Sequence, residues 1–348
     1  MSLTREQALE MFRSDDLIGI GMEADAVRRK LHPDGIVSYI IDRNMNYTNI
    51  CTEYCSFCAF YAPVKGPGRE KGYLLDFDKI YEKIAETLEM GGTGVLMQGG
   101  INPDLKIDWF ERLFRGIKQR FPQVHLHCLS ASEIIGIAEY SGLSLEQTIR
   151  RLKDAGLQSI PGGGAEILDD EVRSKVARLK CTTEDWLNVH RIAHKLSMRT
   201  TATMMFGVGE TVEHRVNHFQ RIYDLQEETG GFTAFIPWTF QPRNTALGGR
   251  GWPESTAVDY LKTLAISRIF LSNFRNVQSS WVTQGLKVCQ MGLRFGGNDV
   301  GSVMLEENVV KAAGTSNCTT EEELRRIIRD AGFRPVQRDT LYRTYFLN

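Results

Sequence analysis

Three of the seven cysteines lie within eight residues of one another: Cys51, Cys55 and Cys58. Three thiolates on one loop, spaced C-x₃-C-x₂-C, can bind three corners of a cubic iron–sulfur cluster, whereas a closed cluster needs four protein ligands. Since no fourth cysteine is near in the sequence, one iron would stay open, which is typical of a reactive site rather than a structural one. The remaining cysteines are isolated, and we expect each to be a small buried residue: Cys128, Cys181, Cys289 and Cys318.

A structural zinc site is the alternative reading of these cysteines. Such a site needs four nitrogen or sulfur ligands, usually in two pairs. Only His125, His127 or Cys128 would complete it. A closed site of this kind would indicate a metal-binding protein that is not an enzyme.

Strand and helix patterns alternate through most of the chain. Short apolar runs predict strands at 36–41, 48–50, 94–100, 124–130, 158–163, 199–207, 231–240, 276–281 and, more weakly, 302–306. Amphipathic helical patterns separate them at 77–91, 107–121, 144–156, 183–197, 210–230 and 255–271. Strict alternation predicts parallel strands with crossover helices, and about eight units fit a (β/α)₈ barrel of the TIM type. A doubly wound sheet would instead have a glycine-rich turn after its first strand, where this chain has cysteines.

The chain is predicted to contain three regions. Residues 1–35 form an N-terminal helical cap, residues 36–306 the barrel, and residues 307–348 a C-terminal extension packed on the barrel. The extension is expected to contain a helix at 319–332 and a short strand within 340–346. The cysteine loop follows a predicted strand, and catalytic residues of such barrels lie at the carboxyl ends of the strands.

Composition narrows the class of partner. The 348 residues include 42 basic and 43 acidic side chains, for a net charge of −1. The chain has no surplus of basic residues, so its charge gives no indication of a nucleic acid or an anionic membrane as partner. The N-terminal residues do not resemble a signal peptide and no apolar stretch is long enough to span a bilayer, so we expect a cytoplasmic protein in a reducing compartment.

The cysteine motif, with Phe57 as the aromatic of C-x₃-C-x-aromatic-C, resembles that of the radical S-adenosylmethionine (SAM) superfamily. Further similar segments extend over nearly the whole chain: QGGINP (98–103), HLHCLSASEI (125–134), PGGGAEIL (161–168), ATMMFGVGET (202–211), FIPWTFQPRNT (235–245) and FGGNDVGSVMLEENVV (295–310). These segments resemble one subgroup, which contains aminofutalosine synthases, deazaflavin (FO) synthases and cyclic dehypoxanthinyl futalosine synthases. FIPWTFQPRNT and KCTTEDWL (180–187) are most similar to the last of these families.

The resemblance implies two cofactors, a [4Fe–4S] cluster on Cys51, Cys55 and Cys58 and SAM on its open iron. It also implies a set of SAM-binding positions: Phe57, Tyr61, Gln98, Gly99, Gly100, Ser130, Glu166, Met205 and Gly207. The superfamily has Gly-Gly-Glu where this chain has Gln98-Gly99-Gly100, so only a backbone role is carried over there. Glu166 would accept hydrogen bonds from the ribose hydroxyls, and a salt bridge is the alternative role for it.

The resemblance further implies dehypoxanthine futalosine as the substrate, in menaquinone biosynthesis. A 5′-deoxyadenosyl radical would remove the hydrogen from C4′ of the sugar, and the sugar radical would close a spiro ring on the aromatic ring. Loss of an electron and a proton would follow. The reductant would be flavodoxin or ferredoxin. The other reactions of the subgroup remain the rivals, and sulfur insertion, as in biotin synthase, would need a second set of cysteines.

The last step needs a base, and the benzoate of the substrate needs a partner. His125 and His127 share one strand face, and a near-neutral pKa would suit either as the base, although a hydrogen-bonded core role is the alternative. Asp299 is a rival for catalysis. Three further residues are expected to bind substrate: Arg243 through the carboxylate, Asn298 at the mouth, and Thr229 at the turn into the strand at 231–240.

Overall fold

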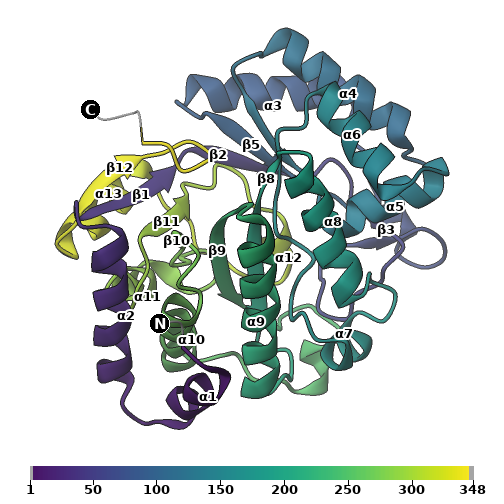
Figure 1. Cartoon of the computed structure of the whole chain (residues 1–348). Coiled ribbons are helices and arrows are strands. Elements are labelled where there is room, and N and C mark those ends of the chain that lie inside the picture. The colour runs from purple at the N-terminus through teal and green to yellow at the C-terminus, as the bar shows by residue number, and fades with distance from the viewer. Residues whose placement is uncertain (1–2, 345–348) are drawn as a thin grey trace.

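A ring of parallel strands forms the centre of the structure, a computed structural model that describes residues 3–344 (Figure 1). The strands of the ring are β1 (Ile36–Ile40), β2 (Asp42–Met45), β5 (Gly94–Met97), β6 (His125–Cys128), β7 (Ser159–Ile160), β8 (Arg199–Phe206), β9 (Phe232–Thr239), β10 (Asn276–Val277) and β11 (Asp299–Ser302). The order β10-β9-β8-β7-β6-β5-β2 makes one sheet of seven strands, all paired in parallel.

The ring closes through β1 and β11. β1 pairs in parallel with β11, with Ser38 opposite Asp299, and an isolated parallel bridge joins Gln278 to Asp299. β1 and β2 are consecutive halves of the first barrel strand, because the β1–β11 register shifts between Ser38 and Ile40 and only β2 continues to β5. The predicted (β/α)₈ barrel is therefore confirmed.

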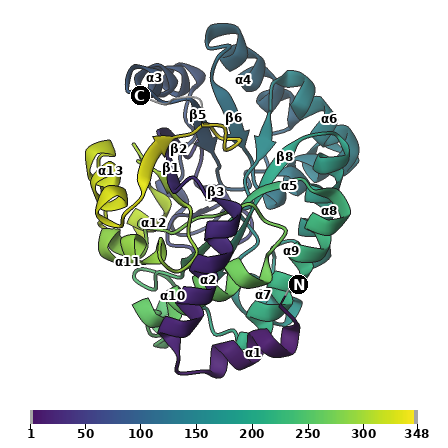
Figure 2. The same ribbon diagram turned by 60° about the vertical axis from the view of Figure 1, so that its left-hand side comes forward.

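Helices cover the outside of the ring (Figures 1 and 2). They are α3 (Phe77–Glu89), α4 (Ile107–Arg120), α5 (Ala131–Ser141), α6 (Leu145–Ala155), α7 (Asp170–Val176), α8 (Thr183–Lys195), α9 (Val212–Thr229), α10 (Ala257–Phe270) and α11 (Gly285–Gly292). Several begin at a hydrogen-bonded cap, as at Ser144 and Thr182, whose hydroxyls accept from the third helical amide. Among residues 3–344 no helix combines the length and hydropathy that crossing a membrane requires.

The two ends of the chain pack on the barrel. α1 (Arg5–Arg13) and α2 (Leu17–Leu31) precede it, and α2 lies against α10 (Figure 2). After the short α12 (Val309–Ala312), α13 (Glu321–Asp330) leads into β12 (Arg334–Gln337), which pairs in parallel with β1.

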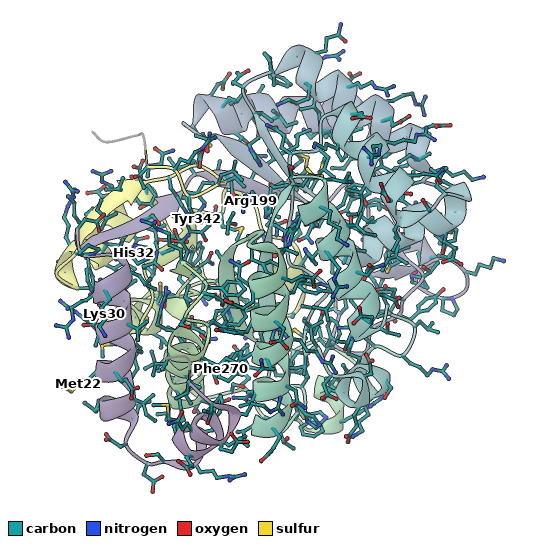
Figure 3. All side chains as sticks on the ribbon, in the orientation of Figure 1. Met22, Lys30, His32, Arg199, Phe270 and Tyr342 are labelled. Carbon is teal, nitrogen blue, oxygen red and sulfur yellow. The ribbon has the colours of Figure 1, made fainter. Side chains whose placement is uncertain are left out.

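The strand predicted at 340–346 is wrong for its described part, because residues 340 and 341 form a turn, residues 342–344 have no regular structure, and β12 lies earlier in the chain. Residues 345 and 346 lie outside the described range. The segment after β12 instead enters the amino end of the barrel. Arg338, Thr340 and Tyr342 line the interior there (Tyr342 is labelled in Figure 3).

Candidate active site

One cavity of about 420 Å³ occupies the interior of the barrel. Cys51, Cys55 and Cys58 line it at the carboxyl ends of the strands, and Arg338 and Tyr342 line it at the amino end. Its walls come from the inward faces of β2, β6, β8 and β9. The cavity therefore extends from the cysteine loop into the barrel, which is where substrates of such barrels meet their catalytic groups.

Local pairing fixes the cysteine loop. β3 (Ile50–Cys51) and β4 (Ala62–Pro63) form a two-stranded parallel pair that holds the two ends of the loop together. The amide of Cys58 donates to the carbonyl of Cys55 at 3.1 Å. Burial raises the pKa of all three thiols, so a bound cation is needed to favour the thiolates.

The donor set fits a cluster better than a single ion. Among residues 3–344 no group of three or more His, Cys, Asp and Glu side chains is arranged to hold one metal ion. The described residues therefore give no support to a mononuclear zinc site completed by His125, His127 or Cys128. A cubic cluster binds each thiolate at a different iron, so its ligands need not converge on one point.

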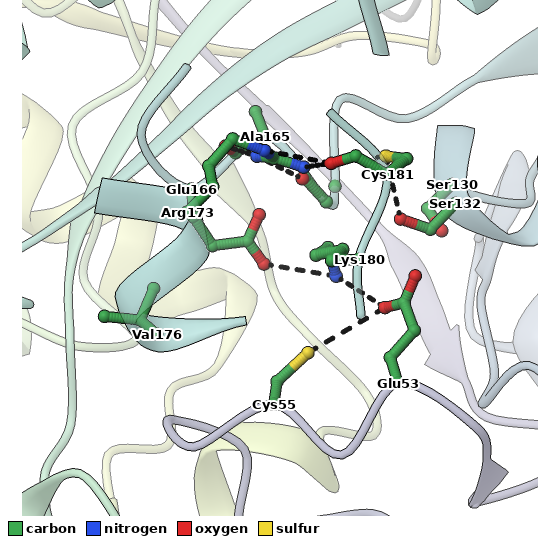
Figure 4. Close-up of polar contacts among 12 residues, drawn as sticks. Glu53, Cys55, Ser130, Ser132, Ala165, Glu166, Arg173, Val176, Lys180 and Cys181 are labelled. Atoms are coloured by element: carbon green, nitrogen blue, oxygen red, sulfur yellow. Dashed lines mark hydrogen bonds and ion pairs between the residues drawn. The ribbon is translucent and has the colours of Figure 1, made fainter. Parts of the chain in front are cut away.

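A charged group lies beside the cysteines (Figure 4). Lys180 Nζ is 3.1 Å from Glu53 Oε2 and 3.5 Å from Glu166 Oε1, and the Cys55 thiol donates to Glu53 Oε2 at 3.8 Å. Burial lowers the pKa of Lys180, but Glu166 and Glu53 outweigh it and hold that pKa well above its usual range. The group thus keeps a permanent ammonium at the cluster end of the cavity.

Glu166 forms the salt bridge that was the alternative role for it, and its second oxygen stays unpaired among the described residues. One oxygen pairs with Lys180, while Oε2 is buried with no hydrogen-bond partner among the described residues. The residue has φ +42°, a left-handed conformation that is strained for a side chain other than glycine. An unpaired carboxylate oxygen held in this way at the cavity wall fits a ligand that brings hydroxyl donors, as the ribose of SAM would.

Gly99 and Gly100 are required by the packing of two loops. A Cβ at Gly100 would lie 2.3 Å from the carbonyl oxygen of Ile50, and one at Gly99 would lie 2.8 Å from the Tyr47 ring. The amide of Gly100 donates to Thr48 O at 2.9 Å, so the loop after β5 is pressed against the segment that leads to Cys51. The amides of Gly99 and Gly100 both donate within the protein, so the backbone of these two residues offers a ligand only its carbonyl oxygens.

The replacement of Gly100 by alanine is expected to displace the cysteine loop. The backbone of Ile50 must move to relieve the 2.3 Å contact, and such overpacking costs about 1–3 kcal/mol. Gly249→Ala is the matched control, because a Cβ at Gly249 has nothing within 4 Å. Urea unfolding and iron content of both variants test this expectation; equal behaviour of the two would contradict it.

Glu133 connects the loop after β5 to the start of α5. Its buried carboxylate accepts from the amides of Gly99 at 2.8 Å and Ser130 at 2.6 Å, and from the Tyr47 hydroxyl at 2.7 Å. Ser130 caps α5. It also lines the cavity, together with Phe57, Tyr61 and Gln98. These predicted cofactor-binding positions therefore lie around one space.

His125 and His127 share a strand face but not the cavity. Both rings lie 2.7 Å from the Ser159 hydroxyl and share it as a hydrogen-bond partner. Only His127 lines the cavity. Burial lowers the pKa of His125 to about 4 and that of His127 to about 3. The near-neutral pKa that a base would need is thus absent, which corrects the expectation for both histidines.

The same histidines predict a pH dependence of stability. Their pKa is lower in the folded than in the unfolded chain, so the unfolded state binds more protons below about pH 6.5 and stability falls as the pH falls toward 4. At pH 5 each should cost about 2 kcal/mol relative to pH 7. Unfolding of apo protein at both pH values should show a smaller loss for His127→Gln than for wild type. An equal loss would contradict the assignment.

Two predicted residues, Asn298 just before β11 and Asp299 at its start, hold the barrel together instead of facing substrate. Asp299 is fully buried and accepts from Ser38 Oγ at 2.6 Å and from Arg338 Nε at 2.6 Å. Asn298 accepts from Arg268 Nη2 at 2.6 Å and from the amide of Val277 at 2.9 Å. Neither lines the cavity, so their predicted catalytic and substrate-binding roles are corrected to structural ones.

Two other predicted contacts lie outside the cavity. The Arg243 side chain is 72% exposed and its Nε is 3.8 Å from Glu254 Oε1, so it does not reach a substrate within the barrel. Thr229 is at the end of α9, where its hydroxyl lies 2.6 Å from His194 Nδ1. Thr229 precedes β9, at the end of the barrel opposite the cysteines, so it too is removed from the site.

Met205 and Gly207 support the site from behind. Met205 is buried, and its amide donates to the carbonyl of Glu166 at 3.0 Å. The amide of Gly207 donates to Glu210 Oε1 at 2.8 Å. Neither lines the cavity, so the predicted direct contact with adenine is replaced by a role in fixing the strand end next to Glu166.

Sequence reasoning missed Glu53 and Lys180. Glu53 lies between the first two cysteines, and Lys180 is the first residue of KCTTEDWL, the segment that resembles the cyclic dehypoxanthinyl futalosine synthases. It also missed Asp42 and Asn44, which line the cavity from β2. Polar residues at alternate positions of DRNMN (42–46) are the signal that would have found them, since alternate residues of a strand share one face.

The fold and the cysteine loop agree with comparisons of the whole chain. The sequence profile of the radical SAM superfamily matches residues 45–222, and the profile described as the CofH/MqnC C-terminal region matches residues 229–347. The chain belongs to the radical SAM superfamily and is a radical SAM enzyme, as the cysteine motif predicted. Enzymes of this superfamily use a [4Fe–4S] cluster and SAM.

Similar sequences of known enzymes indicate which part of the superfamily this chain resembles. The cyclic dehypoxanthine futalosine synthase of Halalkalibacterium halodurans is 49% identical, over 98% of this chain and 90% of its own length. The enzyme of the same name from Streptomyces coelicolor is 45% identical, over 98% and 85%. A 5-amino-6-(D-ribitylamino)uracil–L-tyrosine 4-hydroxyphenyl transferase from Methanococcoides burtonii is 41% identical, over 98% and 95%.

Solved structures show the same fold at low identity. Methylornithine synthase has a TM-score of 0.73 and 18% identity, covering 96% of this chain and 94% of its own. The [FeFe]-hydrogenase maturase HydG has a TM-score of 0.74 and 13% identity, covering 98% and 74%. These similarities concern the fold alone.

Proposed function

We propose that this enzyme converts dehypoxanthine futalosine to cyclic dehypoxanthinyl futalosine, a step of menaquinone biosynthesis. The observation that carries the proposal is the 49% identity, over nearly the full length of both chains, to a cyclic dehypoxanthine futalosine synthase. The cavity supports it, because about 420 Å³ suits a small-molecule substrate beside the cysteines. The enzyme would act in the cytoplasm.

The residues at the carboxyl end of the barrel would hold both cofactors. Cys51, Cys55 and Cys58 would bind the cluster and leave one iron open. Glu166 Oε2 would accept from ribose hydroxyls, and Lys180 would pair with the carboxylate of SAM. When bound, the two cofactors supply a one-electron cleavage that yields a hydrogen-abstracting radical.

The protein's own contribution is to bind and orient the cofactors and the substrate and to enclose them in the barrel. The barrel wall would keep bulk water from the reacting carbon, and His127, neutral at physiological pH, would offer a hydrogen bond to the substrate rather than act as a strong base. Flavodoxin or ferredoxin would supply the electron at the cysteine loop, where Tyr54 is 41% exposed.

The tyrosine-dependent transferase reaction is the rival, because relatives of that name reach 41% identity over the same length. One assay separates the two. The anaerobically reconstituted and reduced protein is given SAM with dehypoxanthine futalosine or, separately, with tyrosine and 5-amino-6-(D-ribitylamino)uracil. Mass spectrometry should detect 5′-deoxyadenosine and a product two hydrogens lighter than the futalosine substrate. A hydroxyphenyl product formed from tyrosine and 5-amino-6-(D-ribitylamino)uracil, with no product formed from dehypoxanthine futalosine, would reject the proposal.

A further inference from the structure

The inward face of the first barrel strand is polar. Asp42, Asn44 and Asn46 alternate along and just beyond β2, and all three line the cavity. Arg43, between them, points outward and pairs with Glu86 Oε2 of α3 at 2.9 Å. A buried wall of this kind needs a hydrogen-bond partner for each polar group.

Asn46, the outermost of the three side chains, has partners for both ends of its amide, whereas Asp42 and Asn44 each keep one oxygen unpaired among the described residues. Asn46 Nδ2 donates to Gln98 O at 3.1 Å, and its Oδ1 accepts from Asn308 Nδ2 at 3.3 Å. Asp42 Oδ1 and Asn44 Oδ1 are buried with no hydrogen-bond partner in residues 3–344. Rotation about the soft Cβ–Cγ bond turns either oxygen of Asp42 toward the cavity. Two acceptors left unpaired here cost free energy unless a ligand supplies donors.

The charges around Asp42 decide what kind of donor fits. Arg338 is already bound by Asp299, with Nε–Oδ2 at 2.6 Å and Nη2–Oδ1 at 3.0 Å. The three groups together carry one net negative charge when Asp42 is ionised, which disfavours a ligand carboxylate. The charge of Arg338 already favours the ionised form of Asp42, so a ligand cation is not required at the same place. Neutral hydroxyl donors satisfy both conditions.

The cavity wall also contains uncharged polar groups, beside apolar side chains such as Leu96 and Ile236. Other strands and the turns after them contribute hydroxyl and amide groups to the cavity: Thr201, Thr203, Gln278, Ser280 and Ser302. Burial raises the pKa of Asp42, with the hydrogen bond from Ser302 and the charge of Arg338 opposing the rise. Hydroxyl donors from a ligand would act in the same direction as Ser302 and stabilise the carboxylate.

We propose that Asp42 and Asn44 form a subsite that accepts hydrogen bonds from two hydroxyl groups of the sugar part of the substrate. Residues two apart on a strand are separated by about 7 Å, so a single hydroxyl does not serve both. The ligand must present two donors on one side. The naming of the sugar rests on the proposed function, whereas the requirement for a polyol rests on the two unpaired acceptors.

Binding without turnover tests the subsite. Reconstituted protein with SAM but no reductant is titrated calorimetrically with dehypoxanthine futalosine. Asp42→Leu is expected to weaken binding about 10- to 100-fold and Asn44→Leu about 5-fold, the effects of losing a charged and a neutral hydrogen bond. Ile41→Val, on the outward face of the same strand segment, is the control and should bind normally. SAM affinity should be unchanged in all three.

Stability separates a ligand-binding role from a structural one. Asp42→Leu loses the hydrogen bond from Ser302 and the attraction of Arg338, but it also removes a buried carboxylate whose Oδ1 has no partner among the described residues, so it should melt close to wild type. If that variant fails to fold, Asp42→Asn replaces it, with a smaller expected loss of affinity. Normal substrate affinity in Asp42→Leu, Asp42→Asn and Asn44→Leu would overturn the subsite and leave solvent as the partner of these acceptors.

Analogues identify the hydroxyls and keep the two proposals apart. An analogue that lacks the hydroxyl facing Asp42 should bind wild type weakly, and Asp42→Leu should bind it as well as it binds the full substrate. Equal losses for every single-deoxy analogue would overturn the subsite. In a further outcome, wild type fails to bind dehypoxanthine futalosine but binds 5-amino-6-(D-ribitylamino)uracil, and Asp42→Leu binds the latter more weakly. That result would contradict the proposed function and support the polyol subsite.

Discussion

Replacing Cys51, Cys55 or Cys58 by alanine is expected to abolish both cluster assembly and SAM cleavage. Two thiolates cannot hold a cube that already leaves one iron without a protein ligand. Since metal binding and ligand deprotonation are coupled, bound iron should fall below roughly a tenth of the wild-type content. Iron and sulfide analysis with visible absorption, together with 5′-deoxyadenosine formation, measures the effect.

The remaining cysteines provide the controls for this experiment. Cys318 is exposed, so the expectation that it is buried is wrong, and Cys318→Ala should assemble a normal cluster. Cys128→Ala tests the zinc alternative, because Cys128 is a residue that would complete a closed site. Loss of metal from Cys128→Ala, or retention of full iron in a Cys55→Ala variant, would contradict the three-cysteine assignment.

Replacement of Lys180 by methionine should damage both stability and SAM binding. The change leaves the buried carboxylates of Glu53 and Glu166 without their cation, and breaking a buried ion pair in this way costs about 3–5 kcal/mol. The loss of the ammonium should also weaken SAM binding by at least about 10-fold, the effect of a charged hydrogen bond. Urea unfolding and equilibrium binding of SAM to the reconstituted protein measure the two effects.

A surface lysine gives the matched control for Lys180. Lys175 pairs with Glu171 at 2.8 Å on the exposed side of α7, and Lys175→Met should cost less than about 1 kcal/mol. Adding Glu53→Gln to Lys180→Met should recover part of the stability by removing one uncompensated charge, without restoring SAM affinity. Wild-type stability in Lys180→Met alone would show that the carboxylates do not depend on this ammonium.

The position of a residue relative to its strand explains which candidates the sequence identified correctly. Gln98 and Ser130 follow strands and line the cavity. Thr229 and Asn298 precede strands, and the structure places them at the opposite end of the barrel. In a parallel barrel only residues after the strands meet at the carboxyl end. A polar residue near a strand is therefore a site candidate only when the chain direction is taken into account.

Burial on several sides hid one helix from the sequence pattern. Seven of the eleven residues of α5 are buried, so its apolar residues show no single stripe and no helix was predicted there. Its capping box of Ser130 and Glu133 was nevertheless legible in the sequence. The capping residues, and not the periodicity, are the local signal of a helix that is enclosed by its neighbours.

A proline explains why the sequence pattern places the C-terminal strand at the wrong residues. β12 contains Pro335, which argues against a strand because it donates no ladder hydrogen bond. The structure accommodates it since β12 pairs with β1 alone. Arg338 then reaches Asp299 across 39 residues of sequence, and such a long-range pair leaves no trace in local composition.

The most direct test of the central claim is electron paramagnetic resonance of the reduced, reconstituted protein with and without SAM. If three cysteines hold a [4Fe–4S] cluster with one iron open, SAM should bind that iron and shift the signal, and the shift should be lost in Cys58→Ala. A cluster signal that SAM leaves unchanged would mean that no iron is open, and it would contradict the account.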